Sequence, residues 1–386
     1  MIGLSSYHVI TLPQRHSDFA SLVLGGTLRH VAMTLLSIFS PIFIYNITSS
    51  LSLTLGFYIL MLVFKMASLL WAENLSQRFG FKGVIRLSGI PFALFIVSLI
   101  LSGQNPLFLV PAALFWGFDS GLFWWGYHGY FIKSARDHFG LKLGEADMVQ
   151  TIAAVATPVL GAFVAAFFGF NALFALAFVF LILSLLVLGK KNDKHQKTDV
   201  SIKDTLSLVL KHKAVSFAYF GGGGELHLYL VVWPLFVFFV FGSVLDLGII
   251  VSAAALLSAA FSIFIGKMVD RRGEKWAIKL GAPLMAFSWG ARLVVSLPVF
   301  IFADSIRHFS QKLVGVPLTE LSYKKAVESS TGTAMLFREI GLVFGAITAL
   351  TIVIMFISLN LSLSTAFIVA LVFSLMPLLA VVKNKI

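Results

Sequence analysis

The sequence of 386 residues contains no cysteine. Disulfide bonds, thiolate metal sites and cysteine nucleophiles are therefore excluded. The chain also lacks the glycine-rich loop followed by Lys-Ser or Lys-Thr that cradles nucleotide phosphates, so we expect no direct use of ATP. The histidines and carboxylates show no recognisable metal-ligand spacing. We accordingly expect neither a metal nor any other cofactor.

Charge is also scarce, because only 12% of the residues are charged while 59% are hydrophobic, and the mean hydropathy is +0.95. A soluble domain has about a quarter of its residues charged. A helix that crosses a bilayer needs roughly 20 apolar residues, so this composition leaves room for many crossings and little else. Residues 1–17 have no basic region followed by an apolar core, and we expect no cleaved signal peptide. The sequence predicts an integral membrane protein without a soluble domain.

The charges fall in alternate gaps between the hydrophobic segments. One set of gaps is short and almost uncharged, at residues 46–50, 103–106, 168–171, 297–298 and 358–361. The other set is rich in Lys and Arg, at residues 78–86, 133–142, 190–213, 267–279, 324–325 and 383–385. Because Lys and Arg are retained on the cytoplasmic side of a membrane, this alternation predicts twelve crossings with both termini in the cytoplasm. It also explains the net charge of +12 without a nucleic-acid partner.

The predicted crossings lie near residues 19–45, 51–73, 83–103, 107–132, 150–168, 171–189, 215–240, 244–268, 276–297, 299–318, 335–357 and 362–382. The longest polar gap, residues 190–213, is a cytoplasmic linker between an N-terminal six-helix bundle (residues 1–189) and a C-terminal six-helix bundle (residues 214–386). The predicted fold is thus an all-α integral membrane protein of two pseudo-symmetric bundles. We expect it in a plasma membrane, of the bacterial inner-membrane kind.

The linker itself is predicted to contain a short helix. Ser201 can cap its N-terminus, and its apolar residues form one stripe: Ile202, Leu206, Val209 and Leu210. We expect this helix to lie on the inner membrane surface.

Related sequences follow the second crossing of each half. The run Gly266-Lys-Met-Val-Asp270-Arg271-Arg272-Gly273-Glu-Lys275 follows the eighth crossing, and Glu73-Asn-Leu-Ser-Gln77-Arg78-Phe-Gly80-Phe-Lys82 follows the second. Arg, Gly and Lys are in register in the two runs. Such a repeat, with its axis along the membrane normal, is one basic design of secondary transporters.

These runs resemble the signature of the major facilitator superfamily, Gly-x-x-x-Asp-Arg/Lys-x-Gly-Arg/Lys-Arg/Lys, which lies between helices 2 and 3 and is often repeated between helices 8 and 9. The first run departs from it, with Glu73 in place of Gly and Gln77 in place of Asp. The resemblance implies the superfamily fold and a gating latch between the bundles on the cytoplasmic side. The residues that match the latch are Arg78, Gly80, Gly266, Asp270, Arg271 and Gly273.

Ionisable residues inside hydrophobic segments are costly to bury and are functional candidates by default. In the superfamily, helices 1, 4, 7 and 10 line the central cavity, and most of the deep charges of this chain lie on those four helices. Six of them are our candidates for substrate binding and proton coupling: Arg29, Asp119, Glu225, Asp304, Arg307 and His308.

Spacing suggests how some of these residues interact. Arg29 and Glu225 each lie about ten residues into a helix that enters from the cytoplasm, and we expect them to pair across the cavity. Asp304 shares a helix face with Arg307 and His308, an arrangement that can bind an anionic or polar substrate or carry a proton.

Three other deep charges have competing interpretations. Lys65 and His128 lie near the cytoplasmic surface, where snorkelling or packing at the latch explains them. Arg292 either forms a structural ion pair inside the second half or takes part in function.

Two clusters of uncharged residues also have two interpretations each. The glycines before Glu225 either form a hinge with free amides near the midplane or allow close helix packing; they are Gly221, Gly222, Gly223 and Gly224. The aromatic residues of the fourth crossing either bind a cationic or ring-bearing substrate or simply pack; they are Trp116, Phe123, Trp124, Trp125, Tyr127 and Tyr130.

We therefore predict a secondary transporter of the major facilitator type, which moves a small molecule by alternating access and couples its transport to protons. Residues 157–162, Thr157-Pro158-Val-Leu-Gly161-Ala162, weakly resemble an antiporter motif and favour export, although a proline kink at a helix contact also explains them. The alternatives are a lipid flippase or uncoupled facilitator and a non-transporting sensor or scaffold.

We do not expect an enzyme. The run Asp119-Ser120-Gly121 matches the aspartic-protease triplet, but that chemistry needs two facing carboxylates in paired loops, and here the triplet lies within a predicted helix. The expected partners are a small-molecule substrate, protons and membrane lipids, but no nucleic acid, and the expected state is a monomer.

Overall fold

The computed structural model describes residues 14–135, 139–189, 200–328 and 330–382. Within these ranges it does not describe the side chains of residues 14–19, 135, 139–148, 152, 260–271, 323–328 and 382. The described chain consists of helices and the turns between them, without a β-strand. The predicted all-α fold class is confirmed.

The elements of the first half are α1 (Gln14–Thr48), α2 (Leu51–Leu87), α3 (Gly89–Ser102), η1 (Pro106–Phe108), α4 (Leu109–Ala135) and α5 (Phe139–Leu188). The linker contains α6 (Ile202–Lys211), for which the Ser201 hydroxyl accepts a hydrogen bond from the amide of Asp204, as predicted for its cap. The elements of the second half are α7 (Lys213–His227), the π-helix η2 (Leu228–Val232), α8 (Trp233–Phe241), α9 (Val244–Arg272), α10 (Glu274–Ala291), α11 (Leu297–Glu328), α12 (Thr331–Ser358), α13 (Thr365–Leu375) and α14 (Leu378–Val382).

Glycines with positive φ divide the long helical runs. Gly80 breaks α2 with φ 72° and ψ 169°, and Gly169 breaks α5 with φ 82° and ψ 169°. Gly273 separates α9 from α10 with φ 81° and ψ 168°. Because this backbone region is essentially restricted to glycine, the glycine shared by the two related runs, Gly80 and Gly273, makes the same turn in both halves.

Six stretches of the described chain are long and apolar enough to cross a membrane. Two of them, Leu51–Ser102 and Val149–Leu188, have 52 and 40 residues. Each is about twice as long as one crossing requires, and each is divided by Gly80 or Gly169. The chain is therefore an integral membrane protein. That all twelve predicted segments cross the bilayer stays a prediction.

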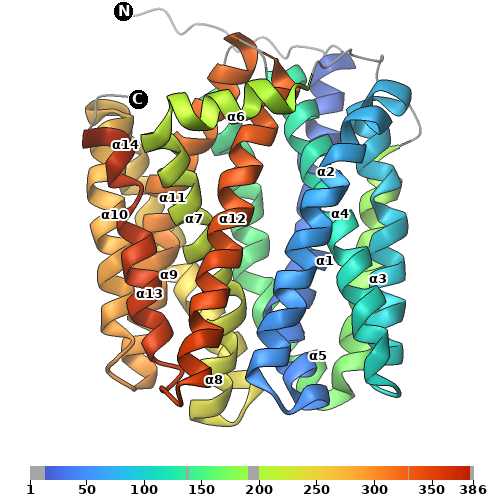
Figure 1. Ribbon diagram of the computed structural model, residues 1–386, viewed down its shortest axis with the longest axis vertical. Helices are drawn as coiled ribbons and strands as arrows, with labels where there is room; N and C mark the ends of the chain where they lie inside the picture. Colours follow the sequence, from blue (N-terminus) through green and yellow to red (C-terminus); the bar gives the residue numbers. More distant parts are fainter. Residues whose placement is uncertain (1–13, 136–138, 190–199, 329, 383–386) are drawn as a thin grey trace, which may run out of the picture.

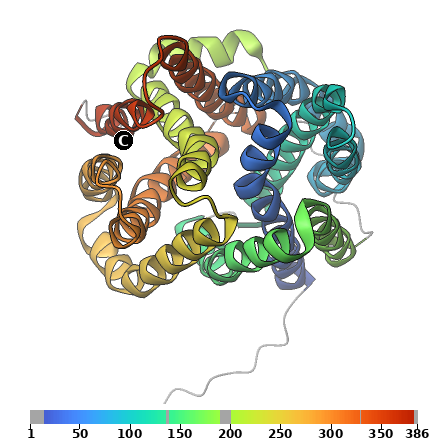
Figure 2. The ribbon, with the colours of Figure 1, turned by 90° about the horizontal axis from the view of Figure 1, so that it is seen from below.

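The helices lie side by side along the long axis of the molecule (Figure 1) and surround its centre when viewed end on (Figure 2). In the first half, α1 packs against α5 and α2 against α4; in the second, α7 packs against α12 and α10 against α11 and α13. The halves meet where α5 contacts α9 and α2 contacts α12. The domain boundaries at residues 189 and 214 stay predictions, and residues 190–199 of the linker lie outside the described residues.

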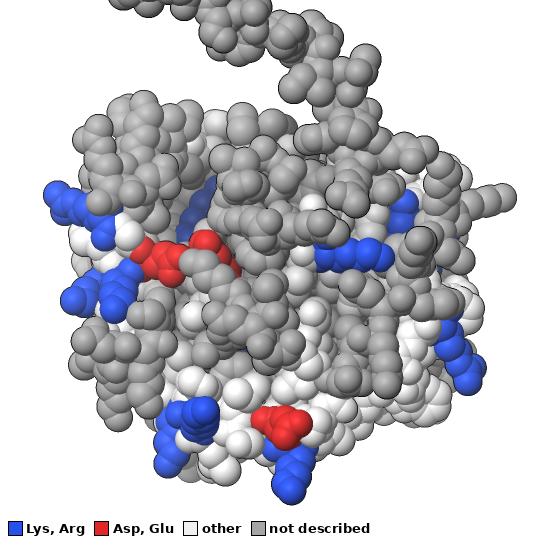
Figure 3. Space-filling model, turned by 90° about the horizontal axis from the view of Figure 1, so that it is seen from above, with Lys and Arg blue, Asp and Glu red and all other residues white. Residues whose placement is uncertain are grey.

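Exposed basic side chains gather at the end of the molecule that α6 crosses, which we call the basic end (Figure 1, Figure 3). They include Arg78, Lys203, Lys211, Lys213, Arg272, Lys275 and Lys279. The described part of this surface shows more Lys and Arg than Asp and Glu (Figure 3).

The antiporter-like segment of α5 lies in the contact between the halves. A Cβ placed at Gly248 of α9 would overlap Ala162, and the amide of Val159 donates a 3.0 Å hydrogen bond to the Ser252 hydroxyl of α9. Pro158 and its small neighbours thus allow α5 and α9 to approach closely. This packing explains the segment, and the direction of transport stays a prediction.

The four glycines of α7 do not break the helix, which continues from Lys213 to His227. The break and free amides that one of the two interpretations required are therefore absent. The glycines instead allow close contact, because a Cβ at Gly223 would overlap the carbonyl of Leu342 in α12, and one at Gly224 would overlap the Phe373 ring in α13. A hinge role for these glycines stays a prediction.

We predict that Gly273→Ala lowers the melting temperature, because an alanine at φ 81° carries backbone strain of about 1–3 kcal/mol. Nothing lies within 4 Å of the position of the new Cβ, so the loss would report backbone conformation alone. Gly56→Ala is the matched control, since its Cβ also meets nothing within 4 Å but its backbone is helical. Thermal unfolding of the detergent-purified variants measures both; equal melting temperatures would contradict the prediction.

Candidate functional site

Glu225 of α7 forms a bidentate ion pair with Arg307 of α11. Arg307 Nε lies 2.9 Å from Glu225 Oε1, and Arg307 Nη2 lies 3.1 Å from Glu225 Oε2. The indole nitrogen of Trp289 in α10 donates a further hydrogen bond of 3.0 Å to Glu225 Oε1. Both charged side chains are buried. Paired geometry of this kind is the strongest form of an arginine–carboxylate contact.

A second ion pair also involves α11. Arg292, the residue that follows α10, places its Nη2 2.7 Å from Asp304 Oδ1 of α11, and both side chains are fully buried. The hydroxyl of Tyr229 donates a 3.1 Å hydrogen bond to Asp304 Oδ2 and lies 3.1 Å from His308 Nε2. The structure thus shows an ion pair of Arg292 inside the second half, and a functional role for it stays a prediction.

Aromatic rings join these two pairs into one cluster, which we call the C-half network: Glu225, Tyr229, Trp289, Arg292, Asp304, Arg307 and His308. The guanidinium carbon of Arg307 lies 3.5 Å from the centre of the Tyr229 ring. That of Arg292 lies 4.3 Å from the Trp289 ring. Tyr229 belongs to the π-helix η2, whose wider turn departs from the α-helical register, and such turns are frequent at functional sites.

A deep ion pair also lies in the first half. Arg29 of α1 forms an ion pair with Asp119 of α4, and both are buried. The guanidinium carbon of Arg29 lies 3.8 Å from the centre of the Phe92 ring and 5.2 Å from that of Phe123. Arg29 Nε and Nη1 have no hydrogen-bond partner among the described residues.

The predicted pairing of Arg29 with Glu225 is therefore wrong. Each residue finds its partner inside its own half, Arg29 with Asp119 and Glu225 with Arg307. Arg29 and Glu225 lie at a similar depth on related helices, but this did not bring them into contact. Each half already contains an oppositely charged residue that can reach its own member of the two. Asp119, Glu225 and Asp304 are each paired with an arginine, which offsets part of the cost of burying them.

A third cluster joins the two halves. Lys65 Nζ of α2 lies 2.8 Å from Glu339 Oε2 of α12, and Arg338 Nη1 lies 2.8 Å from Glu339 Oε1. Arg338 Nη1 also lies 3.0 Å from His128 Nε2 of α4. We call these four residues the bridge. Lys65 and His128 thus pair with the opposite half rather than snorkelling to the surface.

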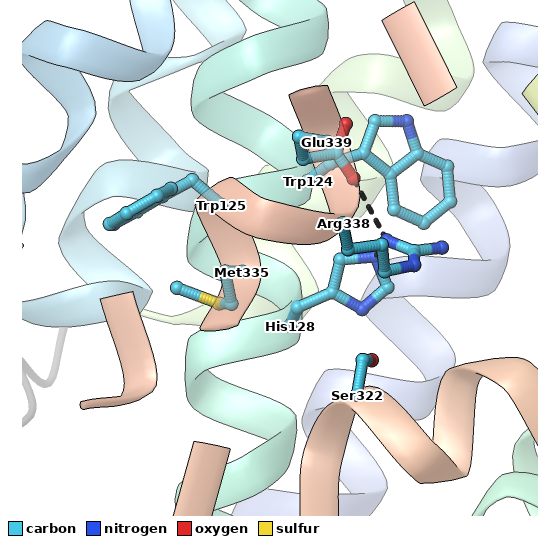
Figure 4. A pocket seen from close by; sticks show the side chains of 7 residues that line it. All are labelled: Trp124, Trp125, His128, Ser322, Met335, Arg338 and Glu339. Carbon is cyan, nitrogen blue, oxygen red and sulfur yellow. Dashed lines mark hydrogen bonds and ion pairs between the residues drawn. The ribbon is translucent and has the colours of Figure 1, made fainter. Parts of the chain in front are cut away.

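Three bridge residues, His128, Arg338 and Glu339, line a narrow space between α4, α11 and α12 (Figure 4). The cavity that remains has a volume of about 10 Å³ and is lined by Trp124, Trp125, His128, Ser322, Met335, Arg338 and Glu339. That is close to the smallest space that a water molecule occupies. No substrate fits there in this arrangement.

Sequence reasoning missed several of these residues. Arg338 and Glu339 lie about two helical turns into α12, which starts at Thr331, and two adjacent charges in an otherwise apolar segment were the available signal. Tyr229 and Trp289 carried no such signal, because aromatic residues recur throughout the chain.

The structure describes only some of the side chains of the latch motif. Arg78 is exposed at the basic end, and the side chains of Gly266, Asp270 and Arg271 lie outside what the structure describes. In the first run, Gln77 Nε2 donates a 2.9 Å hydrogen bond to Glu73 Oε1. Glu73 is buried against the first turn of α12. The first run therefore presents the carboxylate of Glu73 to α12, one helical turn before Gln77, which stands where the family signature has Asp.

The aromatic residues of α4 mainly pack. Trp116 stacks on Phe95 with 4.6 Å between ring centres and contacts Tyr58 at 5.5 Å. Trp124 stacks on His128 at 5.4 Å. These contacts favour the packing interpretation for most of the cluster, with Phe123 beside Arg29 as a member that also touches a deep charge.

A larger hollow lies elsewhere, on the outer face of α10, α11 and α13. It has a volume of about 580 Å³ and an apolar lining. Phe287, Val294 and Phe302 in that lining are more than half exposed, so the hollow faces the lipid rather than the centre. It presents no charged group for a lipid headgroup.

Comparison with known proteins agrees with the helix arrangement. The family model described as Major Facilitator Superfamily matches residues 22–224. Among solved structures, the fold is similar to that of PepTSo, a POT family transporter, with a TM-score of 0.71 and 11% identity over 97% of both chains. No curated protein matches the sequence.

Two further solved structures have the same fold. A D-xylose-proton symporter gives a TM-score of 0.68 at 14% identity, over 95% of this chain and 97% of that one. An auto inhibited POT family peptide transporter gives 0.71 at 11% identity, over 96% of each chain. At these identities the likeness concerns the fold.

We predict that Arg292→Met lowers the melting temperature strongly, because it leaves Asp304 as a buried carboxylate without its cation. Removal of one partner from such a pair costs about 3–5 kcal/mol. The double variant Arg292→Met, Asp304→Leu removes both charges and should recover much of the lost stability. Thermal unfolding of the three proteins provides the measurement. A double variant less stable than the single one would show that the pair itself is not the source of the loss.

Proposed function

The chain belongs to the Major Facilitator Superfamily, and we propose that it is a secondary transporter that moves a small molecule by alternating access, with its transport coupled to protons. The observation that carries this proposal is the set of three carboxylates, each buried in an apolar helix and paired with an arginine. Apolar residues would stabilise a helix bundle as well or better than buried ion pairs. Ionisable groups at this depth therefore indicate function.

Proton coupling follows from the chemistry of the C-half network. A proton on Glu225 would remove its negative charge and leave Arg307 without a counter-ion. An anionic or strongly hydrogen-bond-accepting group of the substrate would then replace Glu225 as the partner of Arg307, beside the ring of Tyr229. Proton and substrate would thus favour each other's binding. Asp304 with Arg292, and Asp119 with Arg29, are the other two pairs in which this exchange is possible.

The bridge serves in this proposal as the gate at the basic end. Opening this end separates α2 and α4 from α12, which breaks the contacts of Lys65 with Glu339 and of His128 with Arg338. Arg338 stays next to Glu339 because both lie on α12. Glu339 therefore keeps one cationic partner in the open state, and its charge is not left unpaired.

The latch residues and the membrane orientation are part of the same proposal. We assign gating to Arg78, Gly80, Gly266, Asp270, Arg271 and Gly273. The basic end faces the cytoplasm by the positive-inside rule, which places both termini there. The host membrane is a plasma membrane, and the transporter acts as a monomer.

A search for the substrate tests the proposed function. We expect an anionic compound, within a panel of sugars, amino acids, organic anions, drugs and lipids, to raise the melting temperature of the purified protein by mass action. The rise should be larger at acidic than at neutral pH, because protonation frees an arginine. A rise confined to lipids and independent of pH would instead favour the flippase alternative.

The variant Glu225→Gln tests the assignment of the coupling residue. A glutamine mimics the protonated carboxyl, so the variant should still bind and exchange the compound identified above but should lose accumulation driven by a proton gradient in proteoliposomes. Asp246→Asn, in the first turn of α9 and outside the network, is the matched control and should retain it. Gradient-driven accumulation that survives Glu225→Gln would contradict the assignment.

The gate can be tested with introduced cysteines, since the natural chain has none. We predict that Lys65→Met increases the labelling of a cysteine at Met335, which lines the small cavity, by a membrane-impermeant maleimide added from the basic end. Loss of the Lys65–Glu339 pair would favour the open state. Arg86→Met, which removes a hydrogen bond to Gly189 within the first half, is the control. Equal labelling in both backgrounds would contradict the gate.

A further inference from the structure

The surface of α6 divides into three sectors. With about 100° between successive residues of an α-helix, Thr205, Leu208 and Val209 fall on one side, and this side faces the bundle. Thr205 is fully buried, and Leu208 and Val209 pack against the cluster that contains Phe337 of α12.

The next sector is apolar but exposed. Ile202, Leu206 and Leu210 recur at every fourth position and are 56%, 52% and 68% exposed. The remaining sector is polar and exposed, and it contains Lys203, Asp204, Ser207 and Lys211. Val209, which the sequence grouped with the apolar stripe, is turned towards the bundle instead.

The position of α6 explains this division. The helix lies across the basic end (Figure 1) and at the outer edge of the bundle rather than over its centre (Figure 2). A helix in that place meets protein on one side, the leaflet on another and water on the third. Phe217 of α7, the helix that follows α6, is also an exposed apolar residue.

We propose that α6 binds the membrane leaflet at the basic end by inserting Ile202, Leu206 and Leu210 among the lipids. Helices with an apolar face and Lys on the polar face bind in this way. Lys203 and Lys211 belong to the polar sector, with Lys203 next to the apolar one, and a leaflet with anionic lipids attracts them.

The anchored helix is also attached to the gate. Gly332 and Thr333 lie in the first turn of α12. The amide of Ser201 lies 3.4 Å from the Thr333 hydroxyl, and Val200 fills the space above Gly332. The same helix carries Arg338 and Glu339 of the bridge. Lipid contact at α6 therefore restrains the start of α12, the element that must move when the basic end opens. Only this consequence rests on the proposed gate; leaflet binding does not.

Spin labels on introduced cysteines test leaflet binding directly. Full-length Leu206→Cys and Ser207→Cys proteins, each with a nitroxide, are reconstituted in vesicles of equal parts phosphatidylcholine and phosphatidylglycerol. The label at position 206 should collide with oxygen and be shielded from a water-soluble nickel chelate. The label at the neighbouring position 207 should show the opposite preference.

Two outcomes would overturn the proposal. Nickel accessibility at position 206 equal to that at 207 would place the stripe in water. Shielding of position 206 from both oxygen and nickel would place protein, such as a second copy of the chain, over the stripe.

A second measurement tests the consequence for the gate. Serine at positions 202, 206 and 210 should remove leaflet binding and change the maleimide labelling of a cysteine at Met335 at least several-fold. The matched variant, with alanine at the exposed residues Asp204 and Ser207 of the polar sector, should change it less. If the labels show insertion but gate labelling stays the same in the triple variant, α6 binds lipid without acting on α12.

Discussion

Pairing of opposite charges in an apolar interior is the constraint on which this structure depends. An isolated charge inside a membrane helix is expensive, and a charged pair is tolerated when geometry and hydrogen bonds compensate for lost water. Asp119, Glu225 and Asp304 each meet an arginine, and rings of Phe, Tyr and Trp cover the guanidinium faces. A charge bound in this way can leave its partner only if another group takes its place, which is the property that coupled transport requires.

The three clusters differ in what they join. The C-half network and the Arg29–Asp119 pair each lie within one half, whereas the bridge connects α2 and α4 with α12. In the proposed mechanism, pairs inside a half would hold the shape of that bundle, and pairs between halves would break during movement. Glu339 combines both kinds of contact, because Lys65 belongs to the other half and Arg338 to its own helix. Glu339 would therefore keep one cationic partner on opening.

Sequence patterns predicted much of the fold, because the lengths of the hydrophobic segments and the positions of the charges between them are directly visible in the sequence. The shared glycine of the two runs was assigned only to the latch, and the structure adds that Gly80 and Gly273 make the same turn in both halves, in a backbone region essentially restricted to glycine. Partners were harder to predict. The pairing of Arg29 depends on how helices rotate about their axes, and the glycines before Glu225 suggested a break where tight packing against α12 is found. Depth along a helix follows from sequence, whereas the facing residue depends on tertiary packing.

The central claim is that the two halves rock about the buried pairs, so that one end opens as the other closes. Distances between spin labels measure this most directly, with one pair at Phe79 and Lys279 at the basic end and another at Leu107 and Leu359 at the opposite end, all four positions being exposed. Lowering the pH of the reconstituted protein should shift the two distance distributions in opposite directions. Distributions that stay fixed, or that widen together at both ends, would contradict alternating access governed by these charges.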